Sequence, residues 1–243
     1  EETYNEIVDK DINTIVLTDR NVSENNIQIP SILMSSALHN YLLRQRIRNQ
    51  VTIIVESGGV RESHQICCLL GFGVDAICPY MSFESIKYHL DNSNIPYRRK
   101  EIYENYRNSI NKGIYKIMSK MGISSLQSYK GAGKFETIGF DKDILETCFP
   151  DMRNTINVVN FDKIKEIFVE HHENVYNDSN IVDGQYSFRE GGEIHYNSPE
   201  IIYQLQKSVK LNNKEQFSEY LKSTDILNKK CTIRGLLKFK ENN

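Results

Sequence analysis

Short apolar runs and amphipathic stretches alternate along the first third of the chain. Three β-branched or aliphatic runs are short enough for buried strands, and a polar turn follows each of the first two. Each of those turns leads into a stretch with apolar residues at helical spacing. Strands that alternate with helices pair in parallel through right-handed crossovers. The pattern predicts strands at residues 13–18, 51–55 and 76–78, with helices at 30–48 and 61–70 between them.

The spacing of apolar residues changes twice within residues 111–139. Apolar residues recur at helical spacing up to Met121, and Gly122 is a natural left-handed stop for that helix. Residues 123–129 are short enough for a strand, and the glycines of 130–133 form a tight turn before another helix. The prediction for this segment is therefore helix, strand, turn and helix.

The second half of the chain is predicted to be mostly helical. A polar loop at 91–100 precedes the long helix, and the stretch 177–192 has little periodicity, which is typical of a linker between units. This places a boundary between residues 1–177 and 178–243. The predicted helices are 101–121, 141–149, 161–176, 199–211, 214–221 and a short one at 232–239.

Composition narrows the class of protein. The 243 residues can bury the core of one domain with an appendage. The formal net charge is -2 with both signs interspersed, so neither nucleic acid nor an anionic membrane is an expected partner. The chain lacks a continuous apolar run of 18 residues and a secretory signal. We expect a soluble intracellular protein whose true N-terminus is missing from this sequence.

The five cysteines are odd in number and irregularly spaced, so disulfides are not expected and a reducing compartment is the default. His64, Cys67 and Cys68 could share a helical face and invite a metal interpretation. No CxxC pair accompanies them. Because free cysteine is commonly a small buried hydrophobe, no metal site is predicted.

Two interpretations stay open for the turn after the second strand. The pair Gly58 and Gly59 could hold an anion on free backbone N–H groups, or it could serve the geometry of the turn alone. Glu56, Arg61 and Glu62 surround this turn and could perform acid–base chemistry or form a structural ion-pair cluster. The sequence offers no nucleophile or metal set beside them.

Polar residues also end the predicted strand at 123–129. Gln127, Ser128 and Tyr129 lie where a buried strand usually stays apolar, unless its end meets a cavity, a partner or a polar network. The following Lys130 to Lys134 contains half of a phosphate loop but lacks its first glycine and its final Ser or Thr, so a tight turn is preferred.

Several stretches resemble one family across nearly the whole chain. Residues 111–139 resemble the MSKMGIS, LQSY and GA signature in the central domain of the glutamate synthase large subunit. Lys130 stands where that family usually has arginine, and Gly59 where it usually has an acidic residue. The other similar stretches are 18–22, 29–33, 55–64 and 70–80 for the central domain, and 190–196, 197–200 and 232–239 for the start of the FMN-binding synthase domain.

This resemblance implies a role within a larger enzyme. Members of the family convert L-glutamine and 2-oxoglutarate to two L-glutamate, with an amidotransferase domain, an ammonia tunnel and an FMN domain. They also carry a 3Fe-4S cluster and take electrons from NAD(P)H or ferredoxin. The central domain is a noncatalytic relative of the FMN barrel that spaces the two sites and helps wall the tunnel.

The expected fold class is therefore α/β: an incomplete (β/α) barrel-like parallel sheet with surrounding helices, plus a mostly helical C-terminal extension. Residues 1–177 would be a truncated central domain, and 178–243 the linker and first segment of the FMN domain. No catalytic residue is expected here, since the resemblance places the amidotransferase nucleophile and the flavin barrel outside these residues. No bound cluster is expected either, since its C-x5-C-x4-C pattern is absent, and no other cofactor is expected.

The partners implied are the amidotransferase and FMN domains of the same polypeptide, with a small subunit or electron-donor domain, in cytoplasm or plastid. Gln127, Ser128, Tyr129 and Lys130 are the candidate tunnel or interdomain surface. The alternative is an autonomous barrel-like enzyme that uses Glu56, Arg61 and Glu62 on a phosphorylated or carboxylated ligand.

Overall fold

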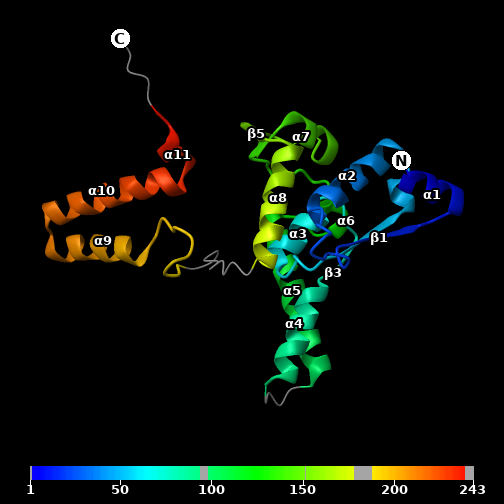
Figure 1. The fold of residues 1–243 in the computed structure, drawn as a ribbon, viewed down its shortest axis with the longest axis horizontal. Coiled ribbons are helices and arrows are strands. Elements are labelled where there is room, and N and C mark those ends of the chain that lie inside the picture. Colours follow the sequence, from blue (N-terminus) through cyan, green and yellow to red (C-terminus); the bar gives the residue numbers. More distant parts are fainter. Residues whose placement is uncertain (1, 94–97, 151, 178–187, 239–243) are drawn as a thin grey trace, which may run out of the picture. The chain divides into compact units, whose positions relative to one another are not determined.

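The computed structural model describes residues 2–93, 98–150, 152–177 and 188–238. The chain divides into two compact units, Glu1–Asn177 and Asp178–Asn243. The predicted loop at 91–100, the predicted linker at 177–192 and the predicted helix at 232–239 each lie partly outside the described residues. Figure 1 labels the elements of both units.

The first unit is built on a three-stranded parallel sheet, which confirms the three predicted strands. The order is β1 (Thr14–Thr18), β2 (Thr52–Glu56) and β3 (Ala76–Cys78). The helix α2 (Ser31–Arg44) and the short 3-10 helix η1 (Arg48–Gln50) connect β1 to β2, and α3 (Ser63–Gly71) connects β2 to β3. The helix α2 ends before the predicted residue 48, because Arg46 adopts a left-handed conformation with φ 62°.

The central strand β2 carries the most deeply buried side chains of the sheet. Ile53 is 0 % exposed and Val55 is 1 % exposed. Val55 lies in a cluster with α3, while Ile53 packs with Leu42 of α2 and with Ile7. Ile7 belongs to α1 (Glu2–Lys10), a helix that the sequence pattern did not predict because Ile7 and Val8 are its only aliphatic residues.

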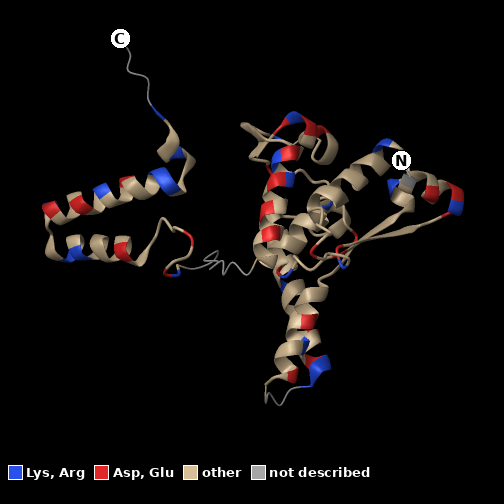
Figure 2. Cartoon of the chain, viewed as in Figure 1, with Lys and Arg blue, Asp and Glu red and all other residues tan. Residues whose placement is uncertain are grey.

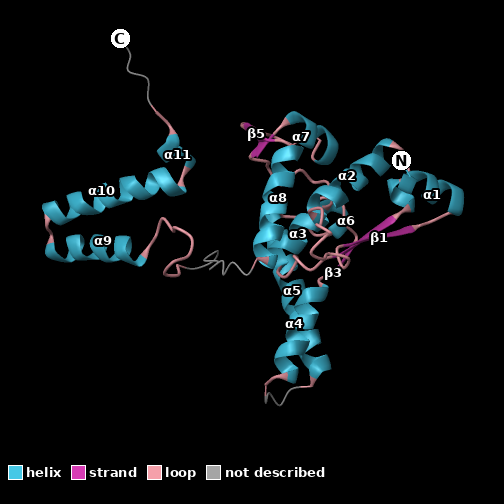
Figure 3. Ribbon diagram, viewed as in Figure 1, coloured by secondary structure: helices cyan, strands magenta, loops and turns pink. Residues whose placement is uncertain are grey.

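Two helices extend together from the sheet, as Figure 3 shows. They are α4 (Tyr80–Asp91), which was not predicted, and α5 (Arg99–Met121). Phe83 of α4 makes edge-on ring contacts with Tyr103 and Tyr106 of α5, at centroid distances of 5.3 and 5.5 Å. Gly122 ends α5 with φ 71°, which confirms the predicted left-handed stop.

The predicted strand at 123–129 is wrong. The segment is extended only at its start and then forms one helical turn, α6 (Leu126–Tyr129). Ile123, Leu126 and Tyr129 recur every third residue, so the helical period of the apolar positions prevails over the shortness of the run. Tyr129, which is 1 % exposed, anchors this turn in the core around α3.

The helix predicted after the glycine turn is also wrong. The chain runs without regular structure to β4 (Gly139–Phe140), which pairs in parallel with β5 (Asn157–Val159). Neither of these short strands was predicted, since neither contains more than two consecutive apolar residues. The helices α7 (Lys142–Cys148) and α8 (Phe161–Tyr176) match their predictions.

The second unit is a helical hairpin. It contains α9 (Pro199–Leu211), α10 (Lys214–Cys231) and the short α11 (Ile233–Leu236). Asn212 makes the turn between α9 and α10 with φ 46°, and the Asn213 side chain caps α10. The helix α10 continues ten residues beyond its predicted end, because the polar run after Leu221 forms an exposed face rather than a loop.

The described residues thus form a mixed α/β structure that is mostly helical, with two small parallel sheets. The part of the chain that the structure describes contains no closed barrel. Figure 2 shows Lys and Arg interspersed with Asp and Glu on both units. None of the helices in the described ranges is long and apolar enough to span a bilayer.

Candidate functional site

The carboxyl ends of parallel strands are where α/β folds usually bind ligands. Here a side chain of the protein occupies the Gly58 turn at that edge. The Asp19 carboxylate, directly after β1, accepts hydrogen bonds from the Gly58 N–H at 2.9 and 3.1 Å and from the Ser57 hydroxyl at 2.7 Å. A bound anion would use the same N–H group. Asp19 therefore occupies the position that the glycine turn could offer to a ligand.

Tyr80, which follows β3, lies against the same turn. Burial and a hydrogen bond to Asp19 raise the pKa of Tyr80 to about 12. A Cβ atom on Gly58 would lie only 2.9 Å from the Tyr80 hydroxyl. The glycine at position 58 is thus needed for this close approach, as one of the two interpretations of the sequence held.

Glu56 pairs with β1 rather than with α3. The Thr18 hydroxyl and the Arg20 Nε each donate to its carboxylate at 2.7 Å. These two hydrogen bonds lower the pKa of Glu56. The Arg20 guanidinium also lies 4.1 Å from the centroid of the Tyr80 ring.

Arg61 and Glu62 serve the start of α3. The Glu62 side chain forms a capping box with Gln65, and the Gln65 side chain also accepts from the Arg61 N–H at 2.8 Å. The Arg61 carbonyl accepts from the Tyr106 hydroxyl at 2.8 Å.

The strand-end network missed by the sequence analysis consists of Asp19, Arg20 and Tyr80. Its signal was available, because Asp19 and Arg20 directly follow the predicted first strand.

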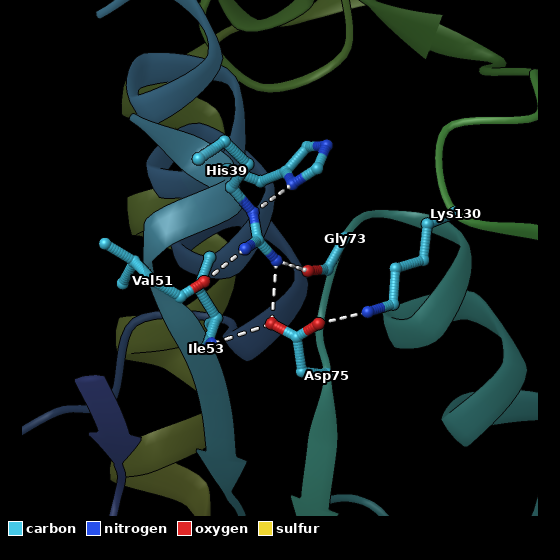
Figure 4. A network of polar contacts seen from close by, with 7 residues as sticks. His39, Val51, Ile53, Gly73, Asp75 and Lys130 are labelled. Carbon is cyan, nitrogen blue, oxygen red and sulfur yellow. Dashed lines mark hydrogen bonds and ion pairs between the residues drawn. The ribbon is translucent and has the colours of Figure 1, made fainter. Parts of the chain in front are cut away.

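A second polar network lies at the opposite, amino-terminal edge of the sheet (Figure 4). Asp75, directly before β3, accepts from the Arg48 guanidinium and from the Ile53 N–H, both at 2.8 Å, and forms an ion pair with Lys130. The side chains of Arg48 and Lys130 are 12 % and 10 % exposed. Arg48 also donates to the Val51 and Gly73 carbonyls.

The contacts in this network determine the protonation of Asp75 and His39. Burial alone would raise the pKa of Asp75, but hydrogen bonds from Ile53, Lys130 and Arg48 together lower it. Burial and the neighbouring Arg48 lower the pKa of His39 to about 4. The Arg48 Nε donates to His39 Nδ1 at 2.8 Å. Since guanidinium can only donate, the neutral His39 carries its proton on Nε2.

This arrangement predicts a pH-dependent stability. The pKa of His39 is about 4 in the folded chain, below the 6.5 of an ordinary histidine, so the unfolded chain binds the extra proton first. The contribution is complete above about pH 6.5 and is lost as the pH falls toward 4. The shift alone corresponds to about 3 kcal/mol, and solvent screening of the partly exposed ring reduces this to about 2 kcal/mol. Denaturant unfolding at several pH values would measure it.

The control for this prediction is His39→Asn, whose amide oxygen can still accept from Arg48 but does not titrate. Its free energy of unfolding should be flat between pH 6.5 and about 5, above the range in which carboxylates titrate. An equal slope in the wild type and this variant would show that another group is responsible.

The four residues of the candidate tunnel surface do not share one environment. Gln127 and Ser128 are exposed, whereas Tyr129 is buried and Lys130 is held by Asp75. The Tyr129 hydroxyl has no hydrogen-bond partner among the described residues, although the Cys67 thiol beside it contributes, after burial, to a raised pKa of Tyr129. The predicted tight turn follows, with Gly131 at φ 65° and Gly133 at φ 62°.

The cysteines are all free thiols in the structure. His64 and Cys68 lie on one face of α3, with Nε2 and Sγ 3.7 Å apart, while Cys67 faces the core and is 1 % exposed. Within the described ranges, no group of three or more His, Cys, Asp or Glu side chains is placed to hold a metal ion.

Comparison with known proteins confirms the resemblance. Residues 1–141 match the family model of the glutamate synthase central domain. The chain is 38 % identical over 241 residues to the glutamate synthase [NADH] of Schizosaccharomyces pombe, covering 96 % of this chain and 11 % of that protein. It is 34 % identical over 222 residues to the glutamate synthase [NADPH] large chain of Bacillus subtilis, covering 90 % and 15 %.

Ferredoxin-dependent relatives are also similar. The ferredoxin-dependent glutamate synthase of Cyanidium caldarium is 32 % identical over 253 residues, covering 93 % of this chain and 16 % of the relative. The chain therefore spans between about a tenth and a sixth of the length of these relatives. By the match over residues 1–141, this chain belongs to the glutamate synthase central domain family.

Proposed function

We propose that this chain is a noncatalytic spacer within a glutamate synthase polypeptide, which converts L-glutamine and 2-oxoglutarate to two L-glutamate. In this role it holds the amidotransferase and FMN domains apart and contributes to the wall of the ammonia tunnel. Residues 1–177 are its central domain, and 178–243 are the linker and first segment of the FMN domain. FMN, the 3Fe-4S cluster and the site for NAD(P)H or ferredoxin belong to other parts of that polypeptide.

The pairing of polar groups with one another at the carboxyl ends of the strands carries this proposal. An α/β enzyme needs an accessible group at the carboxyl ends of its strands. Here Asp19 takes up the Gly58 N–H group, and Glu56 is held by Thr18 and Arg20. The polar groups at the carboxyl ends of these parallel strands therefore bind one another. In a chain of the central domain family, this arrangement supports a scaffold derived from an enzyme-like barrel.

The alternative was an autonomous enzyme with a phosphorylated or carboxylated ligand at Gly58. Such a ligand would have to displace the Asp19 carboxylate, which makes three hydrogen bonds shorter than about 3.2 Å there. It would also need Glu56, Arg61 and Glu62 to act together, whereas Glu56 is paired with Arg20. The geometry favours the scaffold.

The test measures coupling in the full-length enzyme. If the exposed end of α6 contributes to the tunnel wall, then a Gln127→Ala, Ser128→Ala variant should hydrolyse glutamine at the normal rate but yield less glutamate per ammonia released. Glutamine consumption and glutamate formation would be followed together. Tyr129→Ala is unsuitable, because truncating a side chain that is 1 % exposed would destabilise the core.

The matched control is Lys142→Ala, which changes another exposed side chain on α7. Coupling should be normal in that variant. Normal coupling in both variants would contradict a role of the α6 end in the tunnel wall. Intrinsic glutamine hydrolysis by the 243-residue chain alone would contradict the noncatalytic assignment.

A further inference from the structure

A cavity of about 250 Å³ lies beside the polar network at the amino-terminal edge of the sheet. Its lining comes from α2, the end of α3, the end of α6 with the turn after it, and the region around the end of α7. The volume equals the share of about eight water molecules in the liquid. This is space for a small metabolite rather than for a nucleotide. Neither the strand-end network nor the proposed scaffold role uses this cavity.

His39 offers a hydrogen-bond donor to this cavity. Its Nδ1 accepts from Arg48 at 2.8 Å, so its proton is on Nε2. Figure 4 shows this second nitrogen on the side of the His39 ring away from its dashed hydrogen bond. His39 lines the cavity, and in the part of the chain that the structure describes its Nε2 has no hydrogen-bond partner. The donor is fixed in place because Arg48 is itself held by Asp75.

Aromatic rings form the apolar side of the cavity. Phe72 lies 5.3 Å from Phe135 and 4.9 Å from Phe149, measured between ring centroids. The approach of Phe135 depends on Gly71, where a Cβ atom would lie 2.4 Å from that ring. All three rings line the cavity. They would accept the hydrocarbon part of a ligand.

The charges around the cavity favour an anion. Lys134 lines it with an exposed side chain, and the single Asp75 carboxylate is shared between Arg48 and Lys130. A carboxylate in this place would meet donors and a surplus of positive charge.

We propose that this cavity binds a small organic carboxylate, with the carboxylate at His39 Nε2 and Lys134 and the hydrocarbon part against the phenylalanine rings. An uncharged ligand would not use Lys134, and an inorganic anion would leave the aromatic side unfilled. The proposal does not depend on the spacer role, since it concerns a site on a different edge of the sheet.

Calorimetric titration of the 243-residue chain with isovalerate tests the proposal. Isovalerate is branched, singly charged and small enough for the cavity. A ligand with this few atoms should bind with a Kd of about a millimolar. Isovaleramide, which has the same shape without the charge, and inorganic phosphate, which has charge without the hydrocarbon, should both bind at least about tenfold more weakly.

Three variants locate the site. His39→Asn keeps an acceptor for Arg48 but removes the donor, and should weaken isovalerate binding about tenfold. Lys134→Met should weaken it about threefold, because this cation is exposed. Ala132→Phe places a ring in the cavity that Ala132 lines, and should abolish binding. Lys116→Met, a change at an exposed lysine of α5, is the matched control and should bind normally.

Absence of isovalerate binding to the wild type would overturn the proposal. So would equal binding of isovaleramide or phosphate, or unchanged affinity in Ala132→Phe and Lys134→Met. Circular dichroism of each variant checks its folding. If Ala132→Phe does not fold, Lys134→Met still tests the proposal, because the Lys134 side chain is exposed and its replacement should leave the fold intact.

Discussion

Asp75→Ala is expected to destabilise the first unit by about 3 kcal/mol, which is a large part of the stability of a typical domain. The substitution leaves the Arg48 and Lys130 cations without their counter-ion and the Ile53 N–H without its acceptor. Each of these groups was taken out of water on folding, so each loss carries a desolvation cost. Urea unfolding of the 243-residue chain, followed by circular dichroism, would measure the change.

Glu6→Ala is the matched control for Asp75→Ala. It also breaks a carboxylate–cation pair, but the side chains of Lys10 and Glu6 are 63 % and 57 % exposed. Its effect on the free energy of unfolding should be small, because solvent screens an exposed ion pair. Lys130→Met should lessen the cost of Asp75→Ala when the two are combined, since one stranded cation is then removed. Equal costs for Asp75→Ala and Glu6→Ala would contradict a structural role of the network.

Gly73→Ala is expected to cost about 3 kcal/mol or more, for two reasons that add. Gly73 has φ 98°, a conformation that residues with a Cβ atom rarely adopt. The new Cβ atom would also lie 2.1 Å from Nδ1 of the His39 ring. Relief would require His39 to move, and this movement would break its hydrogen bond with Arg48. The measurement is again the free energy of unfolding.

Gly122→Ala separates the cost of the positive φ from the cost of the contact with His39. Gly122 also has a positive φ of 71°, but a Cβ atom there would have no neighbour within 4 Å. This control should show the backbone cost alone, about 1 to 2 kcal/mol. The double variant Gly73→Ala, His39→Ala should recover part of the loss relative to the two single costs. Equal effects at positions 73 and 122 would contradict the contact with His39.

The sequence pattern predicted a helix or strand correctly where the spacing of its apolar residues and the length of the segment indicated the same structure. The strand Ala76–Cys78 and the helix Phe161–Tyr176 were predicted with their observed bounds. In both, the apolar spacing and the flanking residues point to the same structure. Residues 123–129 were mispredicted because the run was short enough for a strand while its apolar positions had the period of a helix.

The interaction partners of the candidate polar residues were predicted less well than the helices and strands. The cluster of Glu56, Arg61 and Glu62 was inferred from nearness in sequence, yet Glu56 pairs with Arg20, which is 36 residues away. Lys130 was assigned to a surface because it followed polar residues, yet it reaches Asp75, 55 residues away. Ion pairs depend on which chain segments become neighbours, and sequence proximity does not report this.

The sequence by itself determined the family, the three strands of the first sheet and most of the helices, because short motifs and hydrophobic periods are local properties of a chain. Only the tertiary structure decided that Asp19 fills the Gly58 turn and that Asp75 holds both Arg48 and Lys130. These contacts join residues that lie between 27 and 55 positions apart. Parallel strands bring their equivalent ends to one edge, so residues that are distant in the chain become neighbours there.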